Sequence, residues 1–136
     1  MSRDLIAAAL AARAKAHAPY SRFRVGAAVR DETGRVHSGC NVENAAYPEG
    51  ICAETAALAA MVLAGGREVV EAVVVGSSST AVTPCGGCRQ RLREFGGPGL
   101  LIHLVDAGGR LIASHTLGEL LPHAFGPNHL SEPSRS

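Results

Sequence analysis

Cys52-Ala53-Glu54 (CAE) and Pro84-Cys85-Gly86-Gly87-Cys88 (PCGGC) are the two stretches around which the fold has to be built. Cys85 and Cys88 form a C-x-x-C pair, and this spacing lets two thiolates bind one ion from a single turn. Cys52 lies far upstream, so another element must supply it. Because thiolate ligands suit zinc, the three cysteines are predicted to bind one Zn²⁺ per chain.

Three protein ligands leave one position of a tetrahedral zinc site open, and catalytic sites keep that position for water. Glu54 stands two residues after Cys52 and is well placed to take a proton from such a water and pass it on. The C-x-x-C pair alone fits a structural zinc knuckle or a redox pair as well as a catalytic site. The upstream Cys-x-Glu and the proline before the pair favour catalysis, because the combined pattern is similar to that of zinc-dependent base deaminases.

Length and composition limit the class of protein. The 136 residues predict a single domain over residues 1–130, followed by a polar tail over residues 131–136. Apolar residues make up 46% of the chain and charged residues 18%, which excludes a disordered protein. The net charge is only +1, and no basic patch is evident. We therefore expect no nucleic-acid partner and a small, near-neutral substrate.

The sequence gives no sign of a membrane or secretory location. No apolar run approaches the roughly 20 residues of a membrane span, and no convincing signal peptide begins the chain. Four cysteines without a secretory segment are typical of thiols or metal ligands in a reducing compartment. We expect a cytoplasmic protein without a membrane partner, in which Cys40 is a free buried thiol.

Hydrophobic periodicity and turn residues predict the order of the elements. Helices are expected over 3–16, 51–64, 85–95 and 116–121, and strands over 24–30, 35–41, 69–76, 100–105 and 111–114. The helix over 51–64 is apolar nearly all round, so it should be buried and carry Cys52 and Glu54 at its first turn. The order of elements predicts an α/β fold with a mixed sheet, and the positive ends of two helix dipoles would face the thiolates.

From Tyr20 to about Leu130, the chain resembles the small, homotetrameric, zinc-dependent cytidine deaminases. Four stretches carry the resemblance: 20–28 (YSRFRVGAA), 41–48 (NVENAAYP), 84–90 (PCGGCRQ) and 120–127 (LLPHAFGP). The second is the most diagnostic, because related base deaminases do not share it. The resemblance implies a three-layer α/β/α fold with a mixed five-stranded sheet, and a homotetramer whose sites are shared between subunits.

The resemblance also assigns roles to individual residues. Cys52, Cys85 and Cys88 are the implied zinc ligands. Glu54 moves protons from the activated water to N3 of the base and on to the departing amine.

The implied substrate contacts come from several stretches. Asn41 and Glu43 bind the ribose 3′-hydroxyl, the Ala53 N–H holds the base carbonyl, and the Thr83 carbonyl receives the leaving amino group. Phe23 packs on the pyrimidine. These residues also have simpler interpretations, since Asn41 and Glu43 could be turn residues and an isolated phenylalanine usually belongs to a core.

Phe125, Tyr47 and Ala45 would complete sites within the tetramer, some of them across subunit boundaries. Phe125 on its own is more simply explained as a core aromatic.

The implied reaction is the hydrolytic deamination of cytidine and 2′-deoxycytidine to uridine and 2′-deoxyuridine with release of ammonia, as in pyrimidine salvage. One alternative is a deaminase of another aminopyrimidine nucleoside such as blasticidin S. A polynucleotide editor would need a basic channel, which the net charge does not favour. A structural zinc domain would have no use for Glu54.

The chain departs from the family pattern at one position. The family usually has Arg-Thr after Cys-Ala-Glu, and here Thr55-Ala56 take that place. The family arginine is thought to donate to the ligand thiolates, which overcompensate the charge of Zn²⁺. Arg89, directly after Cys88, is predicted to be the substitute that donates to a thiolate.

Overall fold

The computed structural model describes residues 3–131, so the predicted tail, except for its first residue, lies outside the described residues. The helices are α1 (Arg3–Arg13), α2 (Ala53–Leu63), α3 (Gly86–Phe95) and α4 (Leu117–Leu120), with short 3₁₀ helices η1 (Tyr47–Glu49) and η2 (Pro127–His129). The strands are β1 (Gly26–Asp31), β2 (Val36–Cys40), β3 (Val69–Val75), β4 (Leu101–Val105) and β5 (Leu111–Thr116). Within this range, no helix is both long enough and apolar enough to cross a bilayer.

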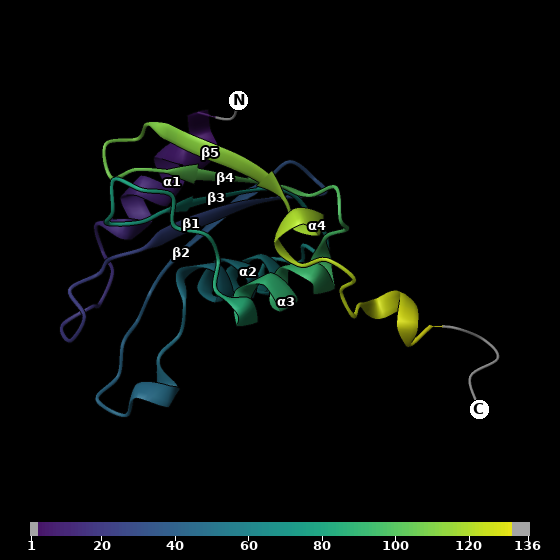
Figure 1. Cartoon of the computed structure of the whole chain (residues 1–136), viewed down its shortest axis with the longest axis horizontal. Helices are drawn as coiled ribbons and strands as arrows, with labels where there is room; N and C mark the ends of the chain where they lie inside the picture. The colour runs from purple at the N-terminus through teal and green to yellow at the C-terminus, as the bar shows by residue number, and fades with distance from the viewer. Residues whose placement is uncertain (1–2, 132–136) are drawn as a thin grey trace.

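The five strands form one mixed sheet in the order β2-β1-β3-β4-β5 (Figure 1). β1 pairs antiparallel with both β2 and β3, whereas β3 and β4 are parallel. β2, β3 and β4 therefore run in the same direction. α2 follows β2 and α3 follows β3, so both helices start from the same edge of the sheet, at the carboxyl ends of these strands. Ligand sites of α/β sheets commonly lie at this edge.

The sheet separates two hydrophobic clusters, which confirms the three-layer α/β/α arrangement. Successive strand residues point to opposite faces, and β3 shows the alternation clearly. Ala72 and Val74 belong to the cluster formed with α2, α3 and α4, while Val73 and Val75 belong to the cluster formed with α1. Burial on both faces explains the apolar run of residues 72–75 in β3.

α2 packs closely on the sheet along one face only. A Cβ atom on Gly39 of β2 would lie 2.4 Å from the Ala57 backbone nitrogen, so only glycine permits this approach. Ala53, Glu54, Ala57, Leu58 and Met61 are buried. Leu63, by contrast, is 91% exposed. The expectation that α2 is buried all round is therefore wrong for this chain, because its outer apolar face has no cover within the described residues.

Several element boundaries differ from the predicted ones. α1 ends at Arg13 rather than at residue 16, and β1 begins at Gly26 rather than at residue 24. Val25 is outside the strand because its N–H donates to Oδ1 of Asn41. The backbone of Cys40, which ends β2, is paired with Gly26, and its thiol is free and half-buried.

The β1–β2 hairpin depends on a buried carboxylate. Asp31 is 0% exposed and accepts hydrogen bonds from the hydroxyl of Thr33 (2.6 Å) and from the backbone N–H groups of Thr33 and Arg35. It also shares a 2.7 Å hydrogen bond with Nε2 of His37. These bonds, led by those from Thr33 and His37, hold the pKa of Asp31 well below its ordinary value.

The depressed pKa of Asp31 predicts how stability depends on pH. Its contribution is present above the ordinary carboxyl pKa, about 3.9, and is lost as pH falls toward the folded-state value. Asp31→Asn should lower the Tm at pH 7 by roughly 5 °C or more, and its Tm gap to wild type should narrow in acid. Thermal melts from pH 7 to pH 3 measure this gap.

Asp106→Asn is the matched control, because Asp106 occupies the β4–β5 turn and its side chain accepts from the N–H groups of Gly108 and Arg110. A gap for Asp31→Asn that stays constant down to pH 3, or one no larger than that of the control, contradicts this interpretation.

Candidate active site

The N-terminal end of α2 carries the first half of the site. Cys52 is the N-cap residue, with extended backbone (φ −80°, ψ 157°), so the helix proper begins at Ala53. Glu54 is the second helical residue and is only 6% exposed. The unpaired N–H groups and the positive dipole end of α2 therefore lie beside the Cys52 sulfur and the Glu54 carboxyl group.

The N-terminal end of α3 carries the second half in the same way. Cys85 is its N-cap residue (φ −65°, ψ 168°), again extended, and the helix begins at Gly86. Cys88 is the third helical residue and is fully buried. Both helices thus begin one or two residues later than predicted, and each has a ligand cysteine as its N-cap.

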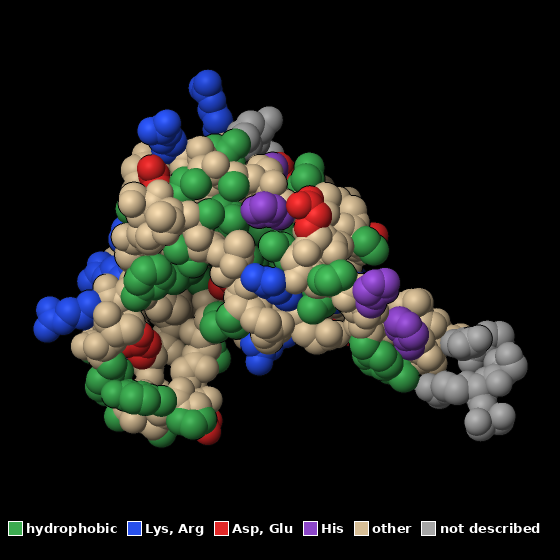
Figure 2. Space-filling model, viewed as in Figure 1, with side chains coloured by type: hydrophobic (Ala, Val, Ile, Leu, Met, Phe, Trp, Pro, Cys, Tyr) green, Lys and Arg blue, Asp and Glu red, His purple; other side chains and the backbone are tan. Residues whose placement is uncertain are grey.

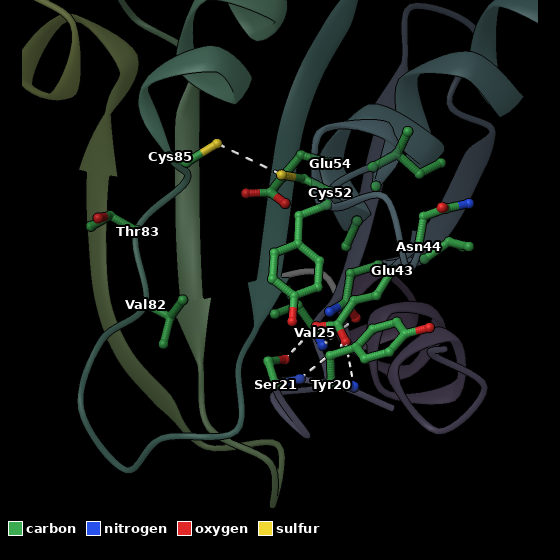
Figure 3. A pocket seen from close by; sticks show the side chains of 16 residues that line it. Tyr20, Ser21, Val25, Glu43, Asn44, Cys52, Glu54, Val82, Thr83 and Cys85 are labelled. Carbon is green, nitrogen blue, oxygen red and sulfur yellow. Dashed lines mark hydrogen bonds between the residues drawn. The ribbon is translucent and has the colours of Figure 1, made fainter. Parts of the chain in front are cut away.

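The three sulfur atoms form one cluster, all within 4.8 Å of one another. Sγ of Cys52 and Sγ of Cys85 are 3.7 Å apart and face the same space (Figure 3). Two thiolates that share a tetrahedral zinc at about 2.3 Å are about 3.8 Å apart. This spacing and the all-sulfur donor set fit Zn²⁺, so Cys52, Cys85 and Cys88 are the residues that would hold it.

The thiols of the cluster ionise unequally. Burial raises the pKa of Cys52, and burial together with the charge of Glu54 raises that of Cys88. Burial also opposes ionisation of Cys85, but hydrogen bonds from the backbone N–H and thiol of Cys88 and from the Cys52 thiol bring its pKa below the ordinary value. Three thiolates in this space need a divalent cation to coexist, because each one opposes ionisation of the next.

Glu54 has the properties of a proton carrier. Burial raises the pKa of its carboxyl group above the ordinary glutamate value, and the carboxyl group lies beside the sulfur cluster (Figure 3). A carboxyl group with a raised pKa holds a proton more readily, and so can both accept and return one during a reaction.

A cavity of about 560 Å³ opens onto these groups, a volume typical of small-molecule sites. Of the predicted residues, Asn41, Glu43, Tyr47, Cys52, Ala53, Glu54, Thr83 and Cys85 line it. The residues that sequence analysis did not assign to the site are Tyr20, Ser21, Val25, Val42, Asn44, Gly50, Ile51 and Val82. Those from 20–44 lie inside the motifs 20–28 and 41–48, and Gly50, Ile51 and Val82 lie within two residues of a motif, but nothing in the sequence marked them individually.

Asn41 and Glu43 hold residues 20–25 against the wall of the cavity by hydrogen bonds. Asn41 accepts from the Val25 N–H (2.8 Å) and donates to the Phe23 carbonyl (2.8 Å). Glu43 accepts from the N–H groups of Tyr20 and Ser21 and from the Ser21 hydroxyl, and the last of these bonds is the main reason that its pKa is lowered. Each side chain keeps hydrogen-bonding capacity for a ligand.

Four of the predicted residues do not line the cavity within one chain, and one of them, Cys88, is fully buried behind it. Phe23 is 37% exposed, and Ala45 lies on the exposed segment between β2 and α2. Phe125 is 55% exposed and borders a separate hollow near the C-terminal end of the described chain, where its ring stacks on His129.

Comparison with known proteins agrees with this geometry. The family model for the cytidine and deoxycytidylate deaminase zinc-binding region matches residues 1–103, which include all three cysteines of the cluster and Glu54. The chain belongs to the cytidine deaminase family. A relative named cytidine deaminase from Mycobacterium tuberculosis is 43% identical over 124 residues, covering 91% of this chain and 89% of its own length.

Two further relatives extend the comparison. A cytidine deaminase from Sporosarcina psychrophila is 41% identical over 127 residues, which are 93% of each chain. The crystal structure of a cytidine deaminase from Burkholderia pseudomallei is 45% identical and superposes with a TM-score of 0.85, covering 92% of this chain and 99% of that one. The cytidine-deaminase fold and the zinc cofactor expected from the sequence are thus confirmed.

The role predicted for Arg89 at this family site is wrong. Its guanidinium donates to the carbonyls of Pro84 (2.7 Å) and Leu120 (2.7 Å) and to the hydroxyl of Thr83 (3.0 Å). Arg89 therefore holds the loop before the C-x-x-C pair and has no bond to a thiolate. The hydroxyl near a ligand sulfur belongs to Thr55, whose Oγ1 lies 3.6 Å from Sγ of Cys88.

The cluster predicts a strict dependence of zinc content on its cysteines. Cys88→Ser removes a buried sulfur ligand, so bound zinc should fall from about one per chain to a small fraction of that after dialysis against chelator. Cys40→Ser is the matched control and should keep the wild-type content. Elemental analysis of both variants checks this, and full zinc retention by Cys88→Ser would refute the assignment.

Proposed function

We propose that this protein catalyses the zinc-dependent hydrolytic deamination of cytidine and 2′-deoxycytidine to uridine and 2′-deoxyuridine, with release of ammonia. The observation that carries the proposal is the position of Glu54, a buried carboxyl group with a raised pKa beside three cysteines that fit zinc. Relatives named cytidine deaminase, at 41% and 43% identity over most of the chain, support this reaction.

Glu54 is the residue that moves protons in the proposed mechanism. When Zn²⁺ is bound, it lowers the pKa of a water molecule enough to supply a nucleophile for C4 near neutral pH. The Glu54 carboxylate accepts the proton of that water and delivers it to N3 of the pyrimidine. It then takes the proton of the hydroxyl group now attached to C4 and passes it to the amino group, which leaves as ammonia while C4 becomes a carbonyl. Burial supports both transfers, because it brings the pKa of Glu54 closer to the working pH.

The other proposed contacts orient the nucleoside. Ala53 is the first residue of α2, so its N–H has no partner within the helix and suits the base carbonyl. The Thr83 carbonyl is assigned to the leaving amino group. Asn41 and Glu43 are assigned to the ribose 3′-hydroxyl. Their hydrogen bonds to residues 20–25 fix the positions of both side chains before the nucleoside binds. Phe23 is assigned to the face of the pyrimidine.

A homotetramer with shared sites is part of the proposal. Two segments project from the body of the chain, one containing η1 and one containing η2 (Figure 1). Tyr47 on the first is 74% exposed and Phe125 on the second is 55% exposed. Hydrophobic side chains gather on the first segment (Figure 2), where Val42 and Ile51 are also exposed.

Exposed apolar surface of this kind marks interfaces, and Leu63 on the outer face of α2 adds to it. Phe125, Tyr47 and Ala45 are assigned to sites completed between subunits. The catalytic domain is assigned to residues 1–130 and the protein to pyrimidine salvage in the cytoplasm.

Glu54→Gln tests the reaction and the proton carrier together. The amide keeps the shape of the side chain but cannot carry the proton, so kcat for cytidine should fall by at least roughly 10³-fold while zinc content stays unchanged. The loss of the ultraviolet absorbance of cytidine and the release of ammonia measure the rate.

Near-normal turnover by Glu54→Gln would exclude Glu54 as the proton carrier. A wild-type enzyme that is inactive on both cytidines but deaminates blasticidin S would replace the substrate and keep the chemistry.

Subunit complementation tests whether sites are shared. Phe125→Ala should lower activity, because each site would lose the phenylalanine supplied by a neighbour. Co-expression with Glu54→Gln chains, which keep Phe125, should raise activity several-fold above the sum of the two variants, since mixed tetramers contain some complete sites. Activity equal to the sum would mean that Phe125 does not act across a subunit boundary.

A further inference from the structure

The zinc site concentrates negative charge. Three thiolates and the Glu54 carboxylate would share one partly buried region, and their summed charge exceeds that of Zn²⁺. Groups that donate hydrogen bonds to the ligand sulfurs would offset this excess. Arg89 already donates to the carbonyls of Pro84 and Leu120 and to the hydroxyl of Thr83. A different side chain must therefore donate to the ligand sulfurs.

Thr55 is in direct contact with a ligand. It follows Glu54 on α2, and its Oγ1 lies 3.6 Å from Sγ of Cys88 on α3. A threonine hydroxyl has one proton to donate and lone pairs to accept with. A zinc-bound Cys88 is a thiolate without a proton, so Thr55 must be the donor in this contact.

Arg91 completes the arrangement. Its Nη1 donates to Oγ1 of Thr55 at 3.2 Å, which fills an acceptor position of that oxygen and favours turning the hydroxyl proton toward the sulfur. Side chains on a helix lean toward its N-terminus, so Arg91 reaches back over the turn that contains the C-x-x-C pair. A Cβ atom on Gly87 would lie only 3.2 Å from Nη1 of Arg91, so a glycine between the two cysteines leaves room for the guanidinium.

We propose that Arg91 and Thr55 form a relay of hydrogen bonds, Arg91 to Thr55 to Cys88, that steadies the Cys88 thiolate as a zinc ligand. Both are positioning residues, because neither would touch the metal or the substrate. The relay also joins α2, which supplies Cys52, to α3, which supplies Cys85 and Cys88. The proposal rests on the zinc site of the proposed enzyme and is independent of the nucleoside that it accepts.

Release of zinc from the loaded enzyme tests the relay without any substrate. The probe is a chelator that changes colour on binding zinc. Thr55→Val keeps the shape of the side chain and removes the hydroxyl, so zinc release should become roughly 10- to 100-fold faster. Thr55→Ser keeps the hydroxyl and should release zinc near the wild-type rate. Arg91→Gln should have a smaller effect, several-fold, because its bond to Thr55 is exposed.

Two comparisons separate the relay from a general loss of structure. Arg110→Gln removes an exposed arginine from the β4–β5 turn and should not change the rate. The double variant Thr55→Val/Arg91→Gln should release zinc no faster than Thr55→Val alone, because Arg91 acts through the hydroxyl. In cobalt-substituted protein, the sulfur-to-metal charge-transfer band should shift in Thr55→Val and Arg91→Gln but not in Arg110→Gln.

Wild-type release rates in both Thr55→Val and Arg91→Gln would overturn the proposal. Multiplicative effects of the two substitutions would also overturn it, because Arg91 would then act independently of Thr55. A protein that shows the relay but does not deaminate cytidine would leave this inference intact and refute the proposed function.

Discussion

The site depends on one constraint: three thiol groups and a carboxyl group must meet at a single edge of the sheet, where each would oppose ionisation of the others. The fold meets this constraint by bringing two helix N-termini together. Because β2, β3 and β4 run in the same direction, α2 and α3 begin at the same edge, and each has a cysteine at its N-cap. The positive ends of both dipoles then face the anionic groups.

Burial gives the two kinds of acid different tasks. It raises the pKa of Cys52 and Cys88, so their ionisation is coupled to the arrival of a divalent cation. It raises the pKa of Glu54 as well, and in the proposed mechanism Glu54 exchanges its proton during the reaction. The same burial thus makes ionisation of the thiols depend on a cation and lets the Glu54 carboxyl group hold a proton more readily.

The sequence was sufficient for the features with a local or periodic signal. The order of elements, the capping box of Thr116 and Glu119 and the grouping of three cysteines with Glu54 were all predicted from it. The exposure of Leu63 was not predicted, because periodicity shows that a face is apolar and does not show what covers it. The bonds from Asn41 and Glu43 to the 20–25 segment were also missed, because contacts between side chains and distant backbone groups leave no pattern.

The misassigned arginine has a simple geometric cause. Arg89 directly follows Cys88, but successive helical residues point about 100° apart. Arg91, three positions after Cys88, lies on the same side of the helix as Cys88.

Catalysis at this site requires three sulfur ligands and one open position on the zinc. X-ray absorption spectroscopy at the zinc edge of the wild-type protein measures this coordination most directly. We predict three sulfur atoms at about 2.3 Å and one oxygen at about 2.0 Å. Four sulfur ligands would indicate a closed structural site and contradict the account.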